Sequence, residues 1–114
     1  MANQREELIE KYADTLRKKF NHQPNMDLLR KVTIGLGPSI YKRDAANVSG
    51  SDEKELARVK HNFLIGKLGL EDKVALDRAI TEVIEEYGVS ERTKYRAVIY
   101  YLLTKKFGKE NIYI

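Results

Sequence analysis

Cationic residues gather near the C-terminal end of the sequence, where they could contact an anionic ligand. The five residues that we predict as contacts for an anion or a nucleic acid are Arg92, Lys94, Arg96, Lys105 and Lys106. In the segment IEEYGVSERTKYR, a helix, a short turn and a second helix follow one another in the order of a helix-turn-helix motif. The N-terminal turns of the second helix of such a motif contact DNA. One hypothesis is therefore that this basic segment binds nucleic acid.

The same segment also fits an ordinary corner between two helices. Gly88 is suited to ending one helix and Ser90 to capping the next. Ile84 stands where the close approach of two helices favours a small residue, and Lys94 stands where such motifs usually have an apolar one. The second helix is also so apolar that little of it could lie in a groove of DNA. We favour the corner and keep nucleic-acid binding as the alternative.

Serine and lysine recur at the spacing of an acyl-transfer motif, Ser-x-x-Lys. The motif occurs as Ser39 with Lys42 and again as Ser51 with Lys54. Enzymes that use it also need a base relay and an oxyanion hole in a two-domain cleft, and the sequence has no counterpart of these. We therefore predict no catalytic residue, and we expect the protein not to be an enzyme.

Signals for cofactors and metals are incomplete. The glycines at 35 and 37 lack the third glycine and the preceding strand of a dinucleotide-binding loop, and Gly66 before Lys67 lacks the upstream glycine of a phosphate-binding loop. His22 and His61 each lack a histidine or carboxylate three or four residues away. We expect neither a cofactor nor a metal ion.

The composition places limits on the compartment and the partner. There is no cysteine, which excludes disulfides and thiolate metal sites, and the formal net charge is +4. No run of eighteen apolar residues is present, and the N-terminal segment MANQREELIEKYADTLRKKF has no apolar core of the kind a signal peptide needs. We predict a cytoplasmic protein with no membrane partner that binds an unknown protein or associates with itself.

Helical periodicity recurs along the chain, and no segment alternates in the manner of a strand. Asn3, Asn25, Asp52 and Ser90 are predicted to cap helices. The predicted helices run from Asn3 to about Phe20, over 26–36, as a short turn over 39–46, from Asp52 to Lys67, from Asp72 to Tyr87 and from Ser90 to about Phe107. The last of these is apolar on more than one side, so it is predicted to be the central helix.

The order of these features resembles that of a small bacterial family known only as a domain of unknown function. The resemblance extends from about Lys11 to Lys109. The segments that carry it most specifically are RDAANVSGSDEKELARV, NFLIGKLGL and YYLLTKKFGK. It implies a helical fold of about this length in a single domain. It implies no reaction, ligand or site.

These observations lead to one prediction of fold and one of function. We predict an all-α, compact single-domain bundle of five or six short helices with non-parallel packing, spanning residues 1–114. The first few residues are expected to be flexible, and the tail at 109–114 is expected to dock on the body. The predicted function is that of a small non-enzymatic protein-interaction module.

Overall fold

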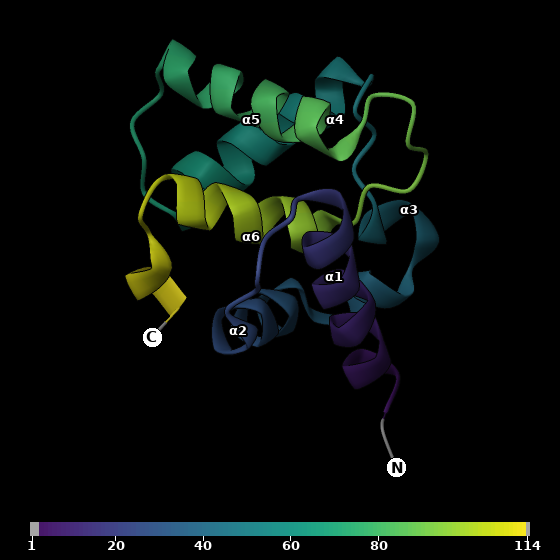
Figure 1. Cartoon of the computed structure of the whole chain (residues 1–114). Coiled ribbons are helices and arrows are strands. Elements are labelled where there is room, and N and C mark those ends of the chain that lie inside the picture. Colours follow the sequence, from purple (N-terminus) through teal and green to yellow (C-terminus); the bar gives the residue numbers. More distant parts are fainter. Residues whose placement is uncertain (1–2, 114) are drawn as a thin grey trace.

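Helices make up nearly all the regular structure of the chain (Figure 1). The computed structural model describes residues 3–113, and no β-strand occurs among them. The α-helices are α1 (Gln4–Lys19), α2 (Met26–Leu36), α3 (Arg43–Ala46), α4 (Glu53–Arg58), α5 (Val74–Tyr87) and α6 (Arg96–Lys106). The shorter or wider helical segments are η1 (Gly37–Tyr41), η2 (Val59–Lys67) and η3 (Glu110–Tyr113). The all-α prediction is confirmed.

Side chains begin three of the helices, as predicted. The Asn3 side chain accepts a hydrogen bond from the amide of Glu6 at 2.9 Å, and Asn25 caps α2 in the same way at 3.2 Å. Asp52 accepts from the first amides of α4. These caps were predictable because each bond joins residues two or three positions apart, so that the local sequence alone specifies it.

The predicted helix from Asp52 to Lys67 changes its winding halfway along. It runs as α4 to Arg58 and continues directly as the π-helix η2. At its end, the amide of Leu68 donates to the carbonyl of Phe63, five residues earlier, at 2.9 Å. Gly69 follows with a φ of 73°, the left-handed conformation that glycine adopts readily at the C-terminal end of a helix.

The predicted start of the last helix at Ser90 is wrong. Helix α6 begins at Arg96, and residues 88–95 form a loop. The loop is irregular because its backbone is used elsewhere: Tyr95 forms an isolated antiparallel bridge with Asn47, and the carbonyl of Lys94 accepts from the amide of Val48 at 2.8 Å. A helix-turn-helix corner needs a turn of about three or four residues. The longer loop at 88–95 removes the feature that suggested this motif.

The start of α5 also lies later than predicted. Asp72 does not cap the helix, because its carboxylate pairs with the ammonium of Lys60 on η2 at 2.8 Å. The helix instead begins at Val74, after Lys73, which supplies no side-chain cap.

Helix α6 lies at the centre of the bundle, as predicted. In Figure 1 it crosses the middle of the molecule, with α4, η2 and α5 on one side and α1 and α2 on the other. Residues on every side of α6 are buried: Ala97, Val98, Ile99, Tyr100, Tyr101, Leu103 and Thr104. A helix that is buried all round must be covered by neighbours on all sides. The neighbours of α6 therefore fix the position of its first turn, which begins at Arg96.

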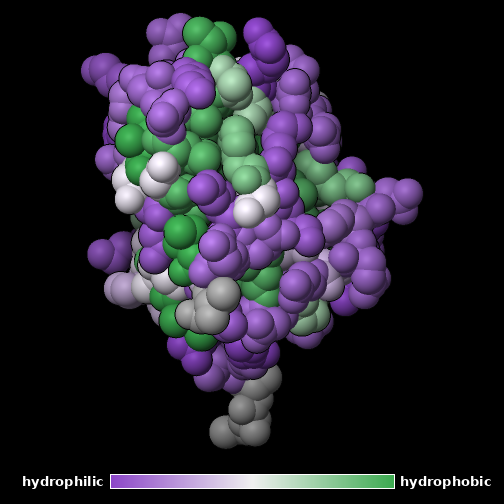
Figure 2. Space-filling model, turned by 90° about the vertical axis from the view of Figure 1, so that its left-hand side faces the viewer, coloured by the Kyte–Doolittle hydropathy of each residue, from purple (hydrophilic) through white to green (hydrophobic). Residues whose placement is uncertain are grey.

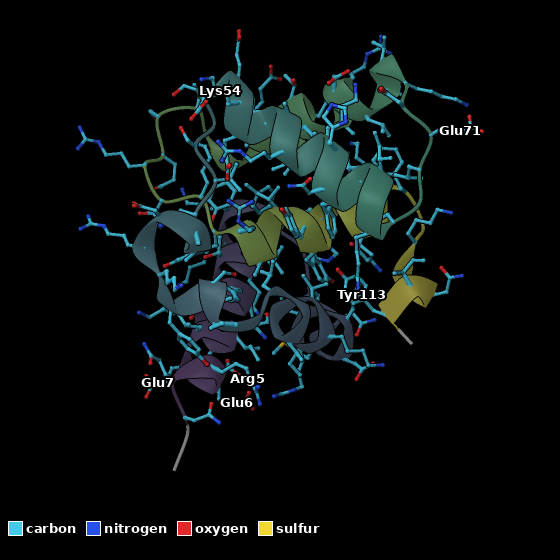
Figure 3. The ribbon with its side chains drawn as sticks, turned by 180° about the vertical axis from the view of Figure 1, so that it is seen from behind. Arg5, Glu6, Glu7, Lys54, Glu71 and Tyr113 are labelled. Atoms are coloured by element: carbon cyan, nitrogen blue, oxygen red, sulfur yellow. The ribbon has the colours of Figure 1, made fainter. Side chains whose placement is uncertain are left out.

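The C-terminal tail lies against α2. The ring of Tyr113 packs on the core and stands 3.6 Å from the position that a side chain on Gly35 would occupy (Figure 3). The ammonium of Lys67 lies 5.3 Å from the centre of the same ring. Ile114 lies outside the described residues, as do residues 1 and 2, for which flexibility was predicted.

Candidate anion-binding cleft

An open cleft of about 860 Å³ lies on the side of the molecule where α3, α4 and the 88–95 loop meet. This is the right-hand side of Figure 1. In Figure 3, which views the molecule from behind, Lys54 marks the end of α4 nearest the cleft, and Glu71 lies at the far end of the same layer. The cleft is lined by residues 43–62 on one wall and by residues 84–100 on the other.

The inner part of the cleft is a buried ion pair between Arg96 and Glu55. Their side chains are 14% and 10% exposed. The Arg96 guanidinium also donates to the carbonyl of Ala45 at 2.8 Å, to the carbonyl of Asn47 at 3.3 Å and to the hydroxyl of Tyr100 at 3.0 Å. Arg96 therefore joins both walls of the cleft, and its hydrogen-bonding capacity is largely used within the protein.

The pKa values of this cluster reflect burial and charge together. Burial opposes the charged form of Arg96, but Tyr100 and Glu55 outweigh it and raise the pKa of the guanidinium. Burial also raises the pKa of the Tyr100 phenol, although Arg96 acts in the opposite direction. The Tyr100 ring is stacked on Phe63 of η2, with ring centres 3.9 Å apart, so the π-helix supports the inner part of the cleft.

Lys94 is buried in the wall of the cleft, and its ammonium group holds the backbone of the 88–95 loop in place. It is 4% exposed, and its ammonium donates to the carbonyls of Val89, at 3.3 Å, and of Glu91. A side-chain carbon on Gly50 would lie 3.3 Å from Lys94 Cε and 3.0 Å from Ile84 Cγ2. Glycine at position 50 therefore lets the two walls of the cleft approach each other closely at this point.

Three exposed arginines line the cleft and mark what we call its mouth, and each comes from a different segment. Arg43 belongs to α3, Arg58 to α4 and Arg92 to the 88–95 loop. Arg43 and Arg92 are exposed and form no salt bridge with any residue from 3 to 113. The Arg58 side chain is 60% exposed and donates to Glu55 at 3.0 Å. The guanidinium groups of these three arginines remain accessible to a ligand. The charged groups of Lys94 and Arg96 are instead held by partners within the protein.

Acidic residues also line the cleft, but besides Glu55 two more of them are already engaged within the protein. Glu91 accepts from the ammonium of Lys19 at 2.7 Å, which lowers the pKa of its carboxyl group. The Asp52 carboxylate accepts hydrogen bonds from the first backbone amides of α4 and so caps that helix. Asp44 is exposed beside Arg43 and has no salt-bridge partner within residues 3–113. The mouth is therefore positive at Arg43, Arg58 and Arg92 but interrupted by carboxylates.

The structure separates the five predicted anion contacts into three groups. Arg92 lies at the mouth of the cleft, whereas Lys94 is buried and the Arg96 side chain is only 14% exposed, so these two are not placed to contact an anion as predicted. Lys105 and Lys106 lie in the last turn of α6, about 15 Å along the helix from Arg96. There they pair with Glu110 at 3.6 Å and with Glu82 at 2.7 Å. The five residues do not form one surface.

Arg43, Arg58 and Glu55 were not predicted as members of a site. They belong to the segment RDAANVSGSDEKELARV, which was noticed only for its resemblance to a family. The only sequence signal for a site in this segment is its high density of charged residues. That signal did not identify the site, because the opposite wall of the cleft lies about forty residues later in the sequence.

Within residues 3–113, no three histidine or acidic side chains are close enough together to hold a metal ion. His22 Nε2 lies 2.9 Å from the Tyr101 hydroxyl, and burial lowers the pKa of this histidine. The Ser39 hydroxyl donates to the carbonyl of Leu36 at 2.8 Å. None of the helices in the described range is both long enough and apolar enough to span a membrane.

The chain matches the model of a known protein family. Residues 11–111 match the model of a family described as "Protein of unknown function (DUF2853)". No curated protein matches the chain.

Proposed function

The chain belongs to this family of proteins of unknown function, and we propose that it is a non-enzymatic protein-interaction module whose cleft binds an acidic segment of a partner. The observation that carries the proposal is the accessible arginine triad, Arg43, Arg58 and Arg92, around the mouth of a cleft with a fixed interior. Guanidinium groups bind carboxylates through paired hydrogen bonds. A ligand with one or two carboxylates would complement all three.

Rigidity of the walls supports this reading. The ion pair of Arg96 with Glu55 and the hydrogen bond from the Val48 amide to the Lys94 carbonyl join the two walls before any ligand is present. Binding then requires little ordering of the backbone, which lowers the entropic cost of association. A cleft of this volume is within the range of about 300–1,000 Å³ that accommodates small ligands, and it suits a few residues of an extended peptide.

Nucleic-acid binding, the alternative reading, has less support. Lys94 is buried, and Arg96, Lys105 and Lys106 already pair with carboxylates. A polyanion favours a continuous basic surface, because its affinity depends on neutralising many phosphates at once.

Peptide selection tests the proposal directly. Short random peptides displayed on phage are selected on the wild-type protein and then depleted on the double variant Arg43→Gln and Arg92→Gln. We expect the surviving peptides to be enriched in Asp and Glu. The control is the double variant Arg17→Gln and Arg78→Gln, which loses the same two positive charges from exposed helix positions outside the cleft and should retain these peptides.

Two results would contradict the proposal. One is a set of selected peptides that binds both double variants equally, because the cleft would then not be their site. The other is salt-dependent binding of single-stranded or duplex DNA or RNA that is lost in Arg43→Gln with Arg92→Gln and retained in the control. That result would replace the proposal with the nucleic-acid alternative.

A further inference from the structure

The mouth of the cleft carries an exposed apolar side chain beside the arginines. Val89 is 75% exposed. The other exposed large apolar residues of the described chain are Ile34, Tyr41, Val74 and Ile112, and none of these lines the cleft. A single exposed valine is ordinary on a protein surface. Val89 stands three residues before Arg92 in a loop that is held in place, and it lines the same cleft.

The loop presents Val89 in a fixed position. The carbonyl of Val89 accepts from the buried ammonium of Lys94 at 3.3 Å, and the amide of Glu91 donates to the carbonyl of Gly88 at 3.0 Å. These bonds hold the backbone on both sides of Val89. The side chain therefore projects from a restrained loop, and an apolar ligand group that covers it would lose little loop entropy on binding.

A second apolar residue of the cleft extends this surface inward. Ile84, at the end of α5, lines the same cleft and is 5% exposed. Together, Val89 and Ile84 give the 84–100 wall an apolar component next to the guanidinium of Arg92. The opposite wall contributes Arg43 and Arg58. One wall thus offers both apolar contact and charge, while the other offers mainly charge.

From this arrangement we infer that the cleft recognises an acidic residue directly next to an apolar one in the partner segment. This inference rests on the proposed function, and it specifies the ligand further. The carboxylate pairs with the arginines, and the neighbouring apolar side chain covers Val89. A phosphate group or a purely acidic stretch would satisfy the arginines and leave Val89 exposed to water.

The test uses three synthetic peptides on isotope-labelled protein, with amide chemical shifts as the readout. They are acetyl-Gly-Glu-Leu-Glu-Gly-amide, the same peptide with Ser in place of Leu, and the same peptide with Gln in place of both Glu residues. We expect the Leu peptide to shift amides in 48–52 and 88–94. The Ser peptide should bind about tenfold more weakly, as loss of a partly buried aliphatic group implies, and the Gln peptide should not bind.

Two valine variants make the test specific. Val89→Ser should weaken the Leu peptide about tenfold and leave the Ser peptide unchanged. Val74→Ser is the matched control, since Val74 is 71% exposed but begins α5 at the opposite end of the molecule. That side faces the viewer in Figure 2, where apolar side chains form a strip between polar ones. The control should bind both peptides as the wild type does.

The outcomes separate the inference from the proposed function. Equal binding of the Leu and Ser peptides in the cleft, with no effect of Val89→Ser, would overturn the inference and leave the acidic-segment proposal standing. Failure of both acidic peptides to shift the cleft amides would overturn both. Inorganic phosphate that shifts these amides at lower concentration than either peptide would also overturn both, because the ligand would then be a phosphate group.

Discussion

Replacing Arg96 with methionine should destabilise the protein strongly, because it would leave the Glu55 carboxylate buried without its main partner. The Glu55 side chain is 10% exposed, and its other partner, Arg58, is 60% exposed to solvent. Breaking a buried ion pair by removing one partner costs about 3–5 kcal/mol. The carbonyls of Ala45 and Asn47 would also lose a donor. We expect the free energy of unfolding to fall by at least about 3 kcal/mol.

This loss would be easy to measure in a domain of this size. Total stabilities are about 5–15 kcal/mol, and each kcal/mol corresponds to about 3–6 °C in Tm for a chain of this length. Arg96→Met should therefore lower Tm by about 10–20 °C, and urea unfolding should show the same loss with an unchanged m-value. Arg17→Met is the control, because Arg17 pairs with Asp14 at 3.2 Å on the surface and should lose less than about 1 kcal/mol.

A double-mutant cycle decides whether the ion pair is the cause. Replacing a buried ion pair by apolar residues of similar volume is often neutral or stabilising. The double variant Arg96→Met with Glu55→Leu should therefore be more stable than the sum of the two single losses implies, by at least about 2 kcal/mol. Additive losses, or an Arg96→Met variant within about 1 kcal/mol of the wild type, would refute the assignment of Arg96 as the residue that joins the walls.

Three further predictions concern the core and its pH dependence. Tyr101→Phe should cost about 1–3 kcal/mol in urea unfolding, because the Tyr101 hydroxyl accepts from the amide of Asn25 at 2.8 Å; an unchanged midpoint would contradict this. Burial lowers the pKa of His22 below its ordinary 6.5, so its contribution to stability is complete above that value and is lost as the pH falls through the folded-state pKa. The variant His22→Asn should show a smaller loss between neutral and mildly acidic pH, and an identical profile would contradict the argument. Leu103→Ala should cost about 2–5 kcal/mol and lower Tm more than Leu102→Ala, because Leu103 is fully buried and Leu102 only partly so; equal shifts would count against this packing.

Features that depend on neighbouring residues were predictable from the sequence, and features that depend on distant ones were not. The caps at Asn3, Asn25 and Asp52 were predicted because each side chain bonds to an amide within three residues. The start of α6 was not, because Gly88 and Ser90 fit both a tight corner and a longer loop. What decides between them is the pairing of Tyr95 with Asn47, and nothing near Tyr95 in the sequence indicates it.

The candidate site divides in the same way. Arg92 was predicted because it stands in a visible run of cations, and the structure places it at the mouth of the cleft. Arg43 and Arg58 were missed because they become its neighbours only when residues 43–62 fold against residues 84–100. Periodicity identified α6 as central, but it did not show that Arg96, in the first turn of α6, would be buried with Glu55.

The positions of Lys94 and Arg92 determine which charge variants can report on binding. Both lie in the 88–95 loop and look equivalent in the sequence, yet Lys94 is 4% exposed and its ammonium is held by two backbone carbonyls. Reversing its charge would place a carboxylate against these carbonyls and unfold the loop, so a loss of binding would not identify a contact. Arg92 is exposed and has no salt-bridge partner among residues 3–113, so its replacement leaves the loop intact. For this reason the binding variants pair Arg92 with Arg43 and leave Lys94 unchanged.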